Sequence, residues 1–391
     1  MQIQDISISG FRSLWNISIN DLRQANIFYG ENNCGKSNLL AALQVLFRVE
    51  RAEEIDSPVA GFYRSDLTNF IDNFTIRNGS PTRVININAK IGLDDKDLSA
   101  VPVFAEFLRN LSILSSHRQW LQLEIEIIRV NDNTAIRITK KATINTHAMY
   151  DSSKPTLQQF FPGSTTKANQ QTKQRAVEAL FLYIMNSFEV ISTGRFLKGE
   201  AIVETSLAAE GFKDWLHNLI ESRGDTYTAF QTIQKWFQGN PFNYGTIRPV
   251  KAGGSTAILI KDDSDRELIL ERLGTGAQQI LALLSAIATS RAKIIGIEEL
   301  ELNLSPSMQF LTFGILRQMI NGSGDAKIGQ LFLTSHSPYL CKREDAELYA
   351  ISYNETNGTQ VEHGLNAVRK LLTKHFDVGF FNISRRSTWR S

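Results

Sequence analysis

The amino-acid sequence predicts an α/β fold, and three observations support this class. A glycine-rich loop at residues 30–37 follows a short apolar strand and precedes a segment that is apolar at helical spacing. Residues 83–145 contain strongly alternating apolar and polar segments, which favour antiparallel strands. From residue 273 onward, helical patterns alternate with buried apolar strands. We therefore expect an α/β core with an antiparallel β lobe and a helical insertion.

The composition is that of an ordinary globular protein. The chain has 391 residues, of which 42% are hydrophobic and 21% charged, enough for two or three domains or one large one. Its net charge of +2 gives no general polybasic character that would argue for nucleic acid. The two cysteines provide neither a disulfide framework nor a metal cluster, and they suit a reducing cytosol. Because we find no signal peptide and no run of about 18 apolar residues, we expect a cytoplasmic protein without membrane contact.

The expected elements divide the chain into three regions, 1–145, 146–245 and 246–391. The first and third hold the two halves of the core, the first also holds the β lobe, and the second holds a loop and helices. The expected strands are residues 2–9, 16–19, 25–29, 83–93, 120–128, 133–145, 190–192, 246–251, 256–261, 267–272, 293–297, 328–334, 347–352 and 359–362. The expected helices are residues 38–49, 174–189, two within 203–238, 276–290, 306–319 and 365–374. Residues 52–82 are expected to be irregular with one short helix, and residues 150–173 to form a mobile loop.

The loop from Gly30 to Ser37 reads G-x-x-x-x-G-K-S, the spelling of a phosphate-binding P-loop. Gly30 and Gly35 allow the backbone to curl so that its N–H groups point at phosphate oxygens, and the next helix presents its positive N-terminus to the same anion. Lys36 adds a charge for the β- and γ-phosphates, and Ser37 offers a hydroxyl to Mg²⁺. The alternative, a chance glycine turn, is disfavoured because the flanking strand and helix are the context that the motif requires.

A second candidate is the pair of acids that ends the apolar segment 293–297. In this interpretation Glu298 orients Mg²⁺ or its water, and Glu299 is the general base that polarises the attacking water. A strand that runs into a solvated acidic turn is the alternative, and it would be equally plausible without other motifs. The P-loop upstream in the same chain favours the catalytic interpretation.

Two further stretches lie where α/β proteins bind ligands. His336 follows the apolar strand 328–334. Ligands commonly bind at the carboxyl end of such a strand. From this position the His336 side chain would reach the γ-phosphate. A lone histidine is more often structural, but its place in this series of motifs favours a functional role. The glycine-rich turn with Gly274 and Gly276 opens the helix 276–290 and is a second candidate anion site, or alternatively a plain strand-to-helix turn.

The order and spelling of these motifs resemble those of ABC-type ATPase heads. The matching stretches are Gly-Phe-Arg-Ser at 10–13, Gly-x-Asn-Asn-x-Gly-Lys-Ser-Asn at 30–38, Ile-Glu-Glu-x-Glu-x-x-Leu-x-Pro at 297–306 and Thr-Ser-His-Ser-Pro at 334–338. Within this class the chain resembles the RecF/SMC-like branch, and within that branch the ATPase domain of the OLD (overcoming lysogenization defect) family and its stand-alone AAA-family relatives. The motifs cover residues 1–48 and 268–345.

The resemblance implies a P-loop ABC-type ATPase head that binds and hydrolyses ATP with Mg²⁺. The nucleotide-binding residues that it implies are Arg12, Gly30, Asn32, Asn33, Cys34, Gly35, Lys36, Ser37, Asn38, Gly274 and Gly276. It assigns the metal to Ser37 and Glu298, and catalysis to Glu299, His336 and Lys36. In such heads the glycine-rich turn caps ATP bound to the other protomer, so a homodimer or a higher homo-oligomer is expected.

The sequence departs from the family pattern at several positions. Gly274 stands where transporter-type heads usually have serine, Leu300 where relatives have proline, and Ser305 where they have histidine. No Q-loop glutamine can be assigned, and Gln122 and Gln158 are the only guesses. Slow hydrolysis is therefore expected.

The OLD nucleases carry a Toprim nuclease domain after the switch histidine. Only 55 residues (391 − 336) follow His336, and their acids, Asp345, Glu347 and Asp377, lack the Toprim spacing. We therefore expect a separate effector subunit to supply any nuclease or toxin chemistry.

Three functional hypotheses follow. In the first, an ATPase couples nucleotide state to DNA or to an effector subunit, in phage defence or DNA repair. In the second, a weakly hydrolysing ATP-bound sensor scaffold sequesters a partner. The third, a transporter nucleotide-binding subunit, is disfavoured by the missing signature serine and the large central insertion.

The sequence predicts the regions of partner and DNA contact less specifically than it predicts the nucleotide site. Residues 150–240 are the expected partner-docking surface, although shielding of the core is equally consistent with their composition. The expectation of DNA contact rests on the resemblance and on scattered basic residues, Lys167, Lys173, Arg175, Arg385 and Arg386.

Overall fold

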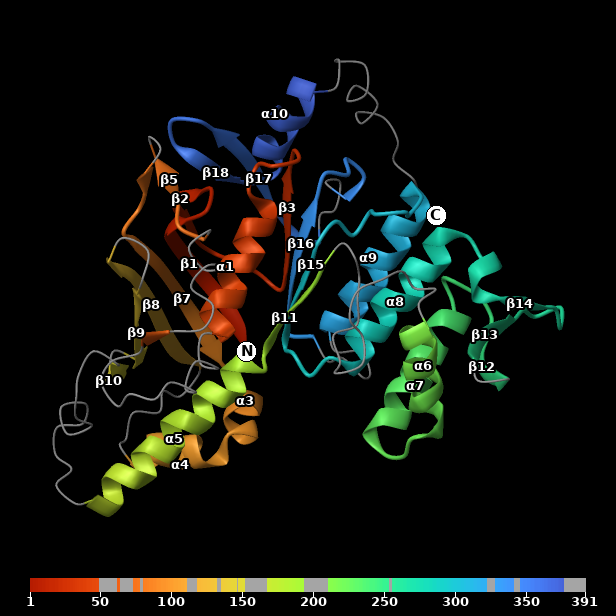
Figure 1. Cartoon of the computed structure of the whole chain (residues 1–391), viewed down its shortest axis with the longest axis horizontal. Coiled ribbons are helices and arrows are strands. Elements are labelled where there is room, and N and C mark those ends of the chain that lie inside the picture. Colours follow the sequence, from red (N-terminus) through yellow and green to blue (C-terminus); the bar gives the residue numbers. More distant parts are fainter. Residues whose placement is uncertain are drawn as a thin grey trace, which may run out of the picture. The chain divides into compact units, whose positions relative to one another are not determined.

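The computed structural model describes twelve stretches of the chain, whose elements are drawn in Figure 1. They are residues 1–48, 62–63, 73–77, 80–110, 118–131, 135–145, 147–151, 167–192, 210–252, 255–321, 328–340 and 345–375. The chain forms two compact units. The first contains Met1–Phe188 with Gly329–Ser391, and the second contains Glu189–Ile328.

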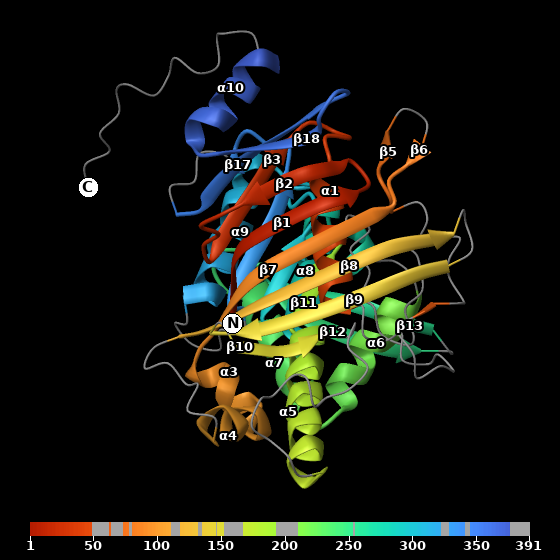
Figure 2. The ribbon, with the colours of Figure 1, turned by 90° about the vertical axis from the view of Figure 1, so that its left-hand side faces the viewer.

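An antiparallel sheet dominates the first unit, as Figure 2 shows. Its strand order is β10 (His147–Asp151), β9 (Ala135–Ile144), β8 (Gln119–Asn131), β7 (Val84–Leu93), β1 (Gln2–Phe11) and β2 (Leu14–Ile19), with the short β4 (Phe62–Tyr63) on β9. Alternation buries one face, so that Ile8, Ile87 and Ile125 lie directly opposite one another on neighbouring strands. The predicted antiparallel β lobe is confirmed.

The second sheet of this unit is built around the buried strand that precedes the glycine-rich loop. The strand β3 (Ala25–Gly30) pairs in parallel with β16 (Gln330–Ser335) and with β17 (Glu347–Asn354), which pairs antiparallel with β18 (Gly358–His363). On one face, the ring of Phe28 stacks on Phe332 at 6.0 Å and on Tyr349 at 5.1 Å. Such a fully buried strand fixes the point at which the loop begins.

Helix α1 (Lys36–Arg48) joins the two sheets of the first unit. It packs against β1 and β7 of the antiparallel sheet and against β3 and β16 of the other (Figure 1). Leucines at helical spacing, such as Leu39 and Leu43, are buried in this position. The remaining elements of the unit are β5 (Ile76–Arg77), β6 (Ser80–Pro81), α3 (Asp95–Ala100), α4 (Pro102–Asn110), α5 (Lys167–Met185) and α10 (Leu365–His375).

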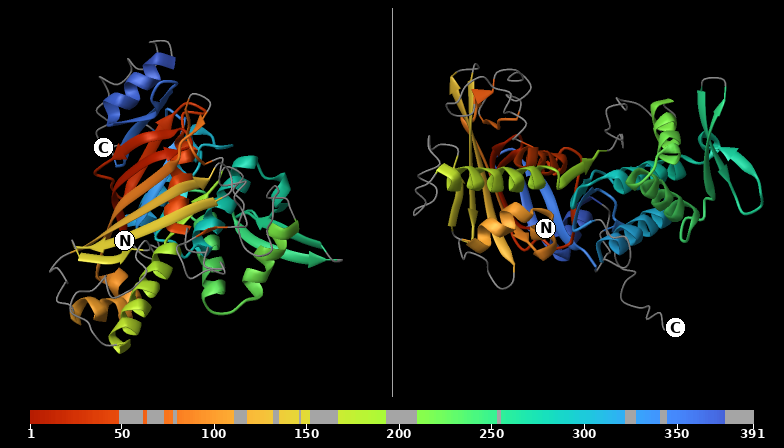
Figure 3. Two further views of the ribbon diagram at one scale, coloured as in Figure 1. Left: turned by 60° about the vertical axis from the view of Figure 1, so that its left-hand side comes forward. Right: turned by 90° about the horizontal axis from the view of Figure 1, so that it is seen from below.

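The second unit combines helices with a small sheet. Its elements are β11 (Phe188–Ile191, from Glu189 on), α6 (Glu210–Glu221), α7 (Asp225–Gln238), β12 (Thr246–Ala252), β13 (Ser255–Lys261), β14 (Glu267–Ile269), the 3₁₀ turn η3 (Leu270–Arg272), α8 (Thr275–Thr289), β15 (Ile294–Ile297) and α9 (Pro306–Asn321). Strands β12, β13 and β14 form a twisted antiparallel sheet, teal in Figure 3, on which α6 packs. Helix α8 is buried from Ile280 to Ala288 and packs against α7.

Several sequence-based assignments were wrong or missing. Strand β10 extends to Asp151, so residues 150–151 are a strand rather than part of the predicted loop. The helix predicted for 174–189 ends at Met185, and residues 188–189 belong to β11. Helix α5 begins at residue 167, so the polar segment 167–173 is helical rather than part of the predicted loop. The strand predicted for 267–272 ends at Ile269 and continues as a 3₁₀ turn. Helices α3 and α4 had no counterpart in the prediction. The rest of the predicted 150–173 loop beyond Asp151, and most of the predicted irregular segment 52–82, lie outside the described residues.

Within the described parts of the chain, no helix is both long enough and apolar enough to cross a membrane.

Candidate functional site

The glycine-rich loop joins the carboxyl end of β3 to the start of α1. Asn33 and Gly35 have positive φ angles of 62° and 104°. Such left-handed residues turn neighbouring N–H groups toward one side of the chain and create a concave anion site. The N–H of Leu39 donates to Gly35 O at 3.2 Å, and no acid lies in the first turn of α1. The positive end of the helix is therefore not neutralised by its own side chains.

Close approaches require glycine at both loop positions, and the positive φ of Gly35 also requires it there. A Cβ atom on Gly35 would lie 2.2 Å from Thr359 Oγ1 and 2.7 Å from Ser13 Oγ. A Cβ atom on Gly30 would lie 2.4 Å from the carbonyl oxygen of Ile351. Any side chain at these positions would push the loop away from its supports.

The side chain of Lys36 lies over this loop. It is only 6% exposed, and its Nζ atom donates to the carbonyl oxygens of Gly30 at 2.9 Å and Glu31 at 2.6 Å. The Cys34 thiol lies 3.9 Å from the same nitrogen. Burial raises the pKa of this thiol and outweighs the lowering effect of the Lys36 charge, so Cys34 stays a neutral thiol.

The chemistry of the loop fits a nucleotide phosphate chain with Mg²⁺. The positive-φ residues turn neighbouring N–H groups to one side of the loop, and the buried Lys36 ammonium carries three donors, two of which bond to the carbonyls of Gly30 and Glu31. The exposed Ser37 on the first turn of α1 offers a hydroxyl oxygen, a ligand type that Mg²⁺ accepts. Asn32 and Asn33 are exposed on the same loop, as the predicted nucleotide contacts require.

Arg12 lies beside the first turn of α1. Its backbone is left-handed (φ 47°), and its N–H donates to Asn73 O at 2.7 Å. The guanidinium donates from Nε to Asn73 Oδ1 at 2.9 Å and from Nη1 to Asn38 Oδ1 at 3.2 Å. The structure therefore brings Arg12 to the residue that directly follows the loop, Asn38.

His336 follows β16 at the same sheet edge as the loop. Because Ser335 pairs with Tyr29 in parallel register, His336 and Gly30 are the next residues of adjacent strands. The His336 side chain is exposed, and the turn after it is held by the N–H of Ser337, which donates to Ser335 Oγ at 2.9 Å. The first unit thus gathers Arg12, the loop and His336.

The predicted acids belong to the second unit. Glu298 and Glu299 follow the buried β15, both half-buried, and the N–H of Glu298 donates to Ile191 O at 2.9 Å. Glu299 has a φ of 44°, and its carbonyl accepts from Leu302 N at 3.0 Å, which closes the turn.

The glycine-rich turn of the second unit opens α8 and touches the segment after the acids. A Cβ atom on Gly276 would lie 3.1 Å from the carbonyl oxygen of Asn303. Gly274, the N-cap of α8, is exposed, and a Cβ atom there would meet nothing within 4 Å. The second unit thus brings this turn close to the end of the acidic segment.

Some site residues were missed by sequence reasoning, and some predicted residues fall elsewhere. Asn73 and Thr359 contact the site from positions with no recognisable motif. The guess Gln122 lies within β8, opposite Lys90 and Thr143, whereas Gln158 lies outside the described residues. Of the predicted basic residues, Arg175 is exposed on α5, which also contains Lys167 and Lys173, and both Arg385 and Arg386 lie beyond the described residues.

The fold and the phosphate loop define the class of protein, an α/β P-loop head of the nucleotide-binding ATPase type. The chain belongs to the family described as "AAA domain, putative AbiEii toxin, Type IV TA system", whose model matches residues 25–342. A search of curated proteins found no match.

Solved structures of SMC heads share the fold. One is an SmcHead bound to the C-winged helix domain of ScpA, with a TM-score of 0.56 and 12% identity over 93% of this chain and 98% of that one. Another is an Smc head domain with an extended coiled coil bound to the C-terminal domain of ScpA, from Pyrococcus furiosus, with a TM-score of 0.50 and 10% identity over 95% and 98% of the two chains. The predicted fold class is confirmed.

Proposed function

We propose that this chain, in the cytoplasm, binds ATP with Mg²⁺ at the loop Gly30–Ser37 and hydrolyses it slowly, so that nucleotide state controls a partner. The observation that carries the proposal is the buried Lys36 ammonium, which is held by loop carbonyls at the start of a helix whose N-terminus has no acid. A buried ammonium at a helix N-terminus without acids favours a polyanion over a neutral ligand.

Each remaining residue has a role that its chemistry supports. Ser37 and Glu298 would hold Mg²⁺, which neutralises charge on the β- and γ-phosphates when bound. Glu299 would accept the proton of the attacking water, and His336 would respond to the γ-phosphate. Arg12 would add positive charge near the phosphates, beside Asn38.

The proposed assembly is a homodimer or higher oligomer of heads, in which Gly274 and Gly276 of one chain face ATP on the other. The exposed start of α8 supports this, because an exposed helix N-terminus is free to meet an anion from another molecule. The partner would be DNA or a separate effector subunit, docked on the surface of residues 150–240, in antiviral defence or DNA repair. Two findings support a protein partner: the family description, which reads "putative AbiEii toxin, Type IV TA system", and the SMC heads that are bound to ScpA domains.

A weakly hydrolysing, ATP-bound scaffold is the second candidate. It is favoured by Gly274, because a glycine at the N-cap of α8 contacts a phosphate across a dimer only through its backbone, without the hydroxyl that a serine would add. A transporter subunit has no comparable support.

Steady-state ATP turnover and the affinity for a fluorescent ATP analogue, with and without duplex DNA, test the proposal. We expect Lys36→Ala to abolish binding and turnover, because it removes the buried charge. We expect Glu299→Gln to keep binding and to lose turnover by about 10²- to 10⁴-fold, the usual contribution of a general base. Stimulation by DNA would favour the motor, and tight binding with negligible turnover under all conditions would favour the scaffold.

Lys370→Ala is the matched control, because Lys370 is exposed on α10 of the same unit. It should bind and hydrolyse like the unmodified protein. If the unmodified protein fails to bind ATP, or if Lys36→Ala binds as well as Lys370→Ala, the proposed function is wrong.

A further inference from the structure

The β17–β18 hairpin carries a buried hydroxyl to the back of the phosphate loop. Thr359, at the start of β18, is 1% exposed. Its Oγ1 atom lies 2.9 Å from the carbonyl oxygen of Cys34, within the loop, and 2.8 Å from Ser13 Oγ, in the turn after β1. In Figure 1 β18 runs next to β2, which begins directly after that turn.

These contacts continue to Arg12. Asn38 donates from Nδ2 to Ser13 Oγ at 2.8 Å and accepts on Oδ1 from Arg12 Nη1 at 3.2 Å. Four hydrogen bonds therefore connect the loop carbonyl of Cys34 with the guanidinium of Arg12, by way of Thr359, Ser13 and Asn38. We call this series of contacts the Thr359 relay.

The number of hydrogens fixes the direction of the relay. A carbonyl oxygen only accepts, so the single hydroxyl hydrogen of Thr359 goes to Cys34 O. The hydroxyl of Ser13 must then donate to Thr359 Oγ1, while its oxygen accepts from Asn38. Every donor points the same way, from Arg12 to the loop, and hydrogen bonds arranged head to tail in this manner strengthen one another.

The backbone holds Thr359 rigidly in this position. Its N–H donates to Ser13 O at 2.8 Å. The preceding Gly358 has a φ of 72°, and a Cβ atom there would lie 2.6 Å from the same carbonyl oxygen. The hairpin turn is itself fixed, because Asn354 Oδ1 accepts from the N–H groups of Thr356 at 2.8 Å and Asn357 at 2.9 Å.

The relay determines where one loop amide points. In a planar trans peptide the C=O and the following N–H point in opposite directions. Because the Cys34 carbonyl points at Thr359, the N–H of Gly35 points away from Thr359. A phosphate-binding loop depends on such N–H groups being fixed before the ligand arrives, since their reorientation would otherwise weaken binding.

We infer that Thr359 is a positioning residue of the nucleotide site. Its hydroxyl orients the Cys34–Gly35 peptide of the phosphate loop and, through Ser13 and Asn38, holds the guanidinium of Arg12. The inference rests on the proposed function, because it concerns how the same site is prepared for ATP.

The experiment compares Thr359→Val with Thr359→Ser. Valine keeps the shape and removes the donor, whereas serine keeps the hydroxyl. We expect Thr359→Val to weaken the binding of a fluorescent ATP analogue and to raise KM by about 10-fold, the effect of one lost hydrogen bond. Thr359→Ser should remain within about 3-fold of the unmodified protein.

Coupling to Arg12 separates positioning from plain packing. In an Arg12→Ala background the loss caused by Thr359→Val should shrink, because part of it acts through the guanidinium. A merely structural role would lower the melting temperature equally in both backgrounds and leave the affinity of the folded protein unchanged. Ser13→Ala, which breaks the relay but leaves the contact with Cys34, should reproduce only the Arg12-dependent part.

The outcomes are distinct. If the unmodified protein binds ATP and Thr359→Val binds equally well, the inference is wrong and the proposed function stands. Equal losses in the valine and serine variants would also overturn the inference, because they would assign the effect to packing. If Thr359→Val does not fold, the comparison of Ser13→Ala with and without Arg12→Ala decides, and additive effects would overturn it. Absence of ATP binding in the unmodified protein would overturn both.

Discussion

Glu299 adopts a backbone conformation that residues with a side chain avoid. Its φ is 44°, and Asn303, four residues later, has a φ of 59°. A left-handed residue with a Cβ atom costs about 1 kcal/mol relative to the usual conformation, and glycine would relieve this strain. A glutamate that is kept in such a position next to a buried strand end supports a role for its carboxylate, and the proposed general base is such a role.

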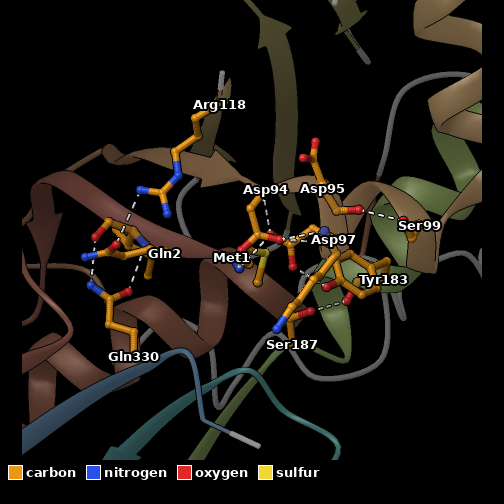
Figure 4. Close-up of polar contacts among 12 residues, drawn as sticks. Met1, Gln2, Asp94, Asp95, Asp97, Ser99, Arg118, Tyr183, Ser187 and Gln330 are labelled. Atoms are coloured by element: carbon orange, nitrogen blue, oxygen red, sulfur yellow. Dashed lines mark hydrogen bonds and ion pairs between the residues drawn. The ribbon is translucent and has the colours of Figure 1, made fainter. Parts of the chain in front are cut away.

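A group of charged residues surrounds the amino group of Met1 in the first unit (Figure 4). The amino group of Met1 lies 2.6 Å from Asp97 Oδ2 and 3.7 Å from Asp94 Oδ2. The hydroxyl of Tyr183 donates to Asp97 Oδ1 at 2.5 Å. Burial and the Asp97 carboxylate raise the pKa of Tyr183, so this hydroxyl remains a donor at neutral pH.

We predict that the charge of Asp94 contributes stability that disappears in acid. Burial acts to raise the pKa of Asp94, but hydrogen bonds from the N–H groups of Asp97 and Lys96 and the positive amino group outweigh it, so the pKa is lowered. A carboxyl whose folded pKa is lowered stabilises the fold above its unfolded pKa, near 4, and loses that contribution as pH falls through the folded pKa. Urea unfolding should therefore show a larger difference between the unmodified protein and Asp94→Asn at pH 7 than at pH 3.

Asparagine is the appropriate replacement because it keeps the N-cap of α3 while removing the charge. Asp94→Ala removes the cap as well, and should cost about 1 kcal/mol more at both pH values. An equal difference between Asp94→Asn and the unmodified protein at pH 7 and pH 3 would contradict the prediction.

At the scale of elements, the sequence predicts best where apolar residues follow one another without interruption. The helix over 276–290 and the strand over 293–297 agree with α8 and β15 to within one residue, because almost every position is buried. Helices α3 and α4 are short, so their hydrophobic pattern spans too few turns to be distinctive. The first turns of α5 are polar, and helix propensity alone did not distinguish them from a loop.

The residues of the candidate site also divide into those that a local sequence pattern predicts and those that depend on long-range contacts. The loop residues and the acids after β15 were predictable, because their spacing along the chain is itself the signal. Thr359 was not, since it contacts Cys34 across 325 residues of sequence and depends on how β18 lies beside β2. No local pattern encodes such a contact, whereas the position of His336 depends only on the register of adjacent parallel strands.

Helix α9 offers a test of element stability. It begins at Pro306, a favoured first residue, and contains Gly314 in its interior. A Cβ atom on Gly314 would meet nothing within 4 Å, and glycine is about 1 kcal/mol less favourable than alanine inside a helix. We predict that Gly314→Ala raises the free energy of unfolding in urea by about 0.5–1 kcal/mol.

Gly358→Ala is the opposing control, because its φ is 72° and its Cβ atom would lie 2.6 Å from Ser13 O. It should destabilise the protein by about 1–3 kcal/mol. A loss of stability in Gly314→Ala would show that this face of α9 is covered by another surface, against the prediction.

At the scale of the whole molecule, the site residues are divided between two compact units. The first carries the phosphate loop, and the second carries the acids and the glycine-rich turn. The exposed Gly274 has no conformational need to be glycine, since its φ of −58° and ψ of 149° suit any residue. Because a Cβ atom there also meets nothing within 4 Å, its own fold gives no reason for the missing side chain.

The reason would then lie outside the chain, and a close approach of phosphate oxygens from ATP on a second copy is the proposed one. We predict that Gly274→Ala lowers the free energy of unfolding by about 0.5–1 kcal/mol, because alanine is a poorer N-cap than glycine. In the Glu299→Gln background, where hydrolysis is blocked, it should lower the fraction of dimer that light scattering detects with ATP and Mg²⁺. Gly314→Ala in the same background should leave that fraction unchanged, because Gly314 lies in the interior of α9 and is remote in sequence from the glycine-rich turn. An ATP-dependent dimer that tolerates Gly274→Ala would separate the glycine-rich turn from nucleotide contact. A dimer lost by this substitution while the monomer stays folded would assign the turn to the neighbouring chain's ATP.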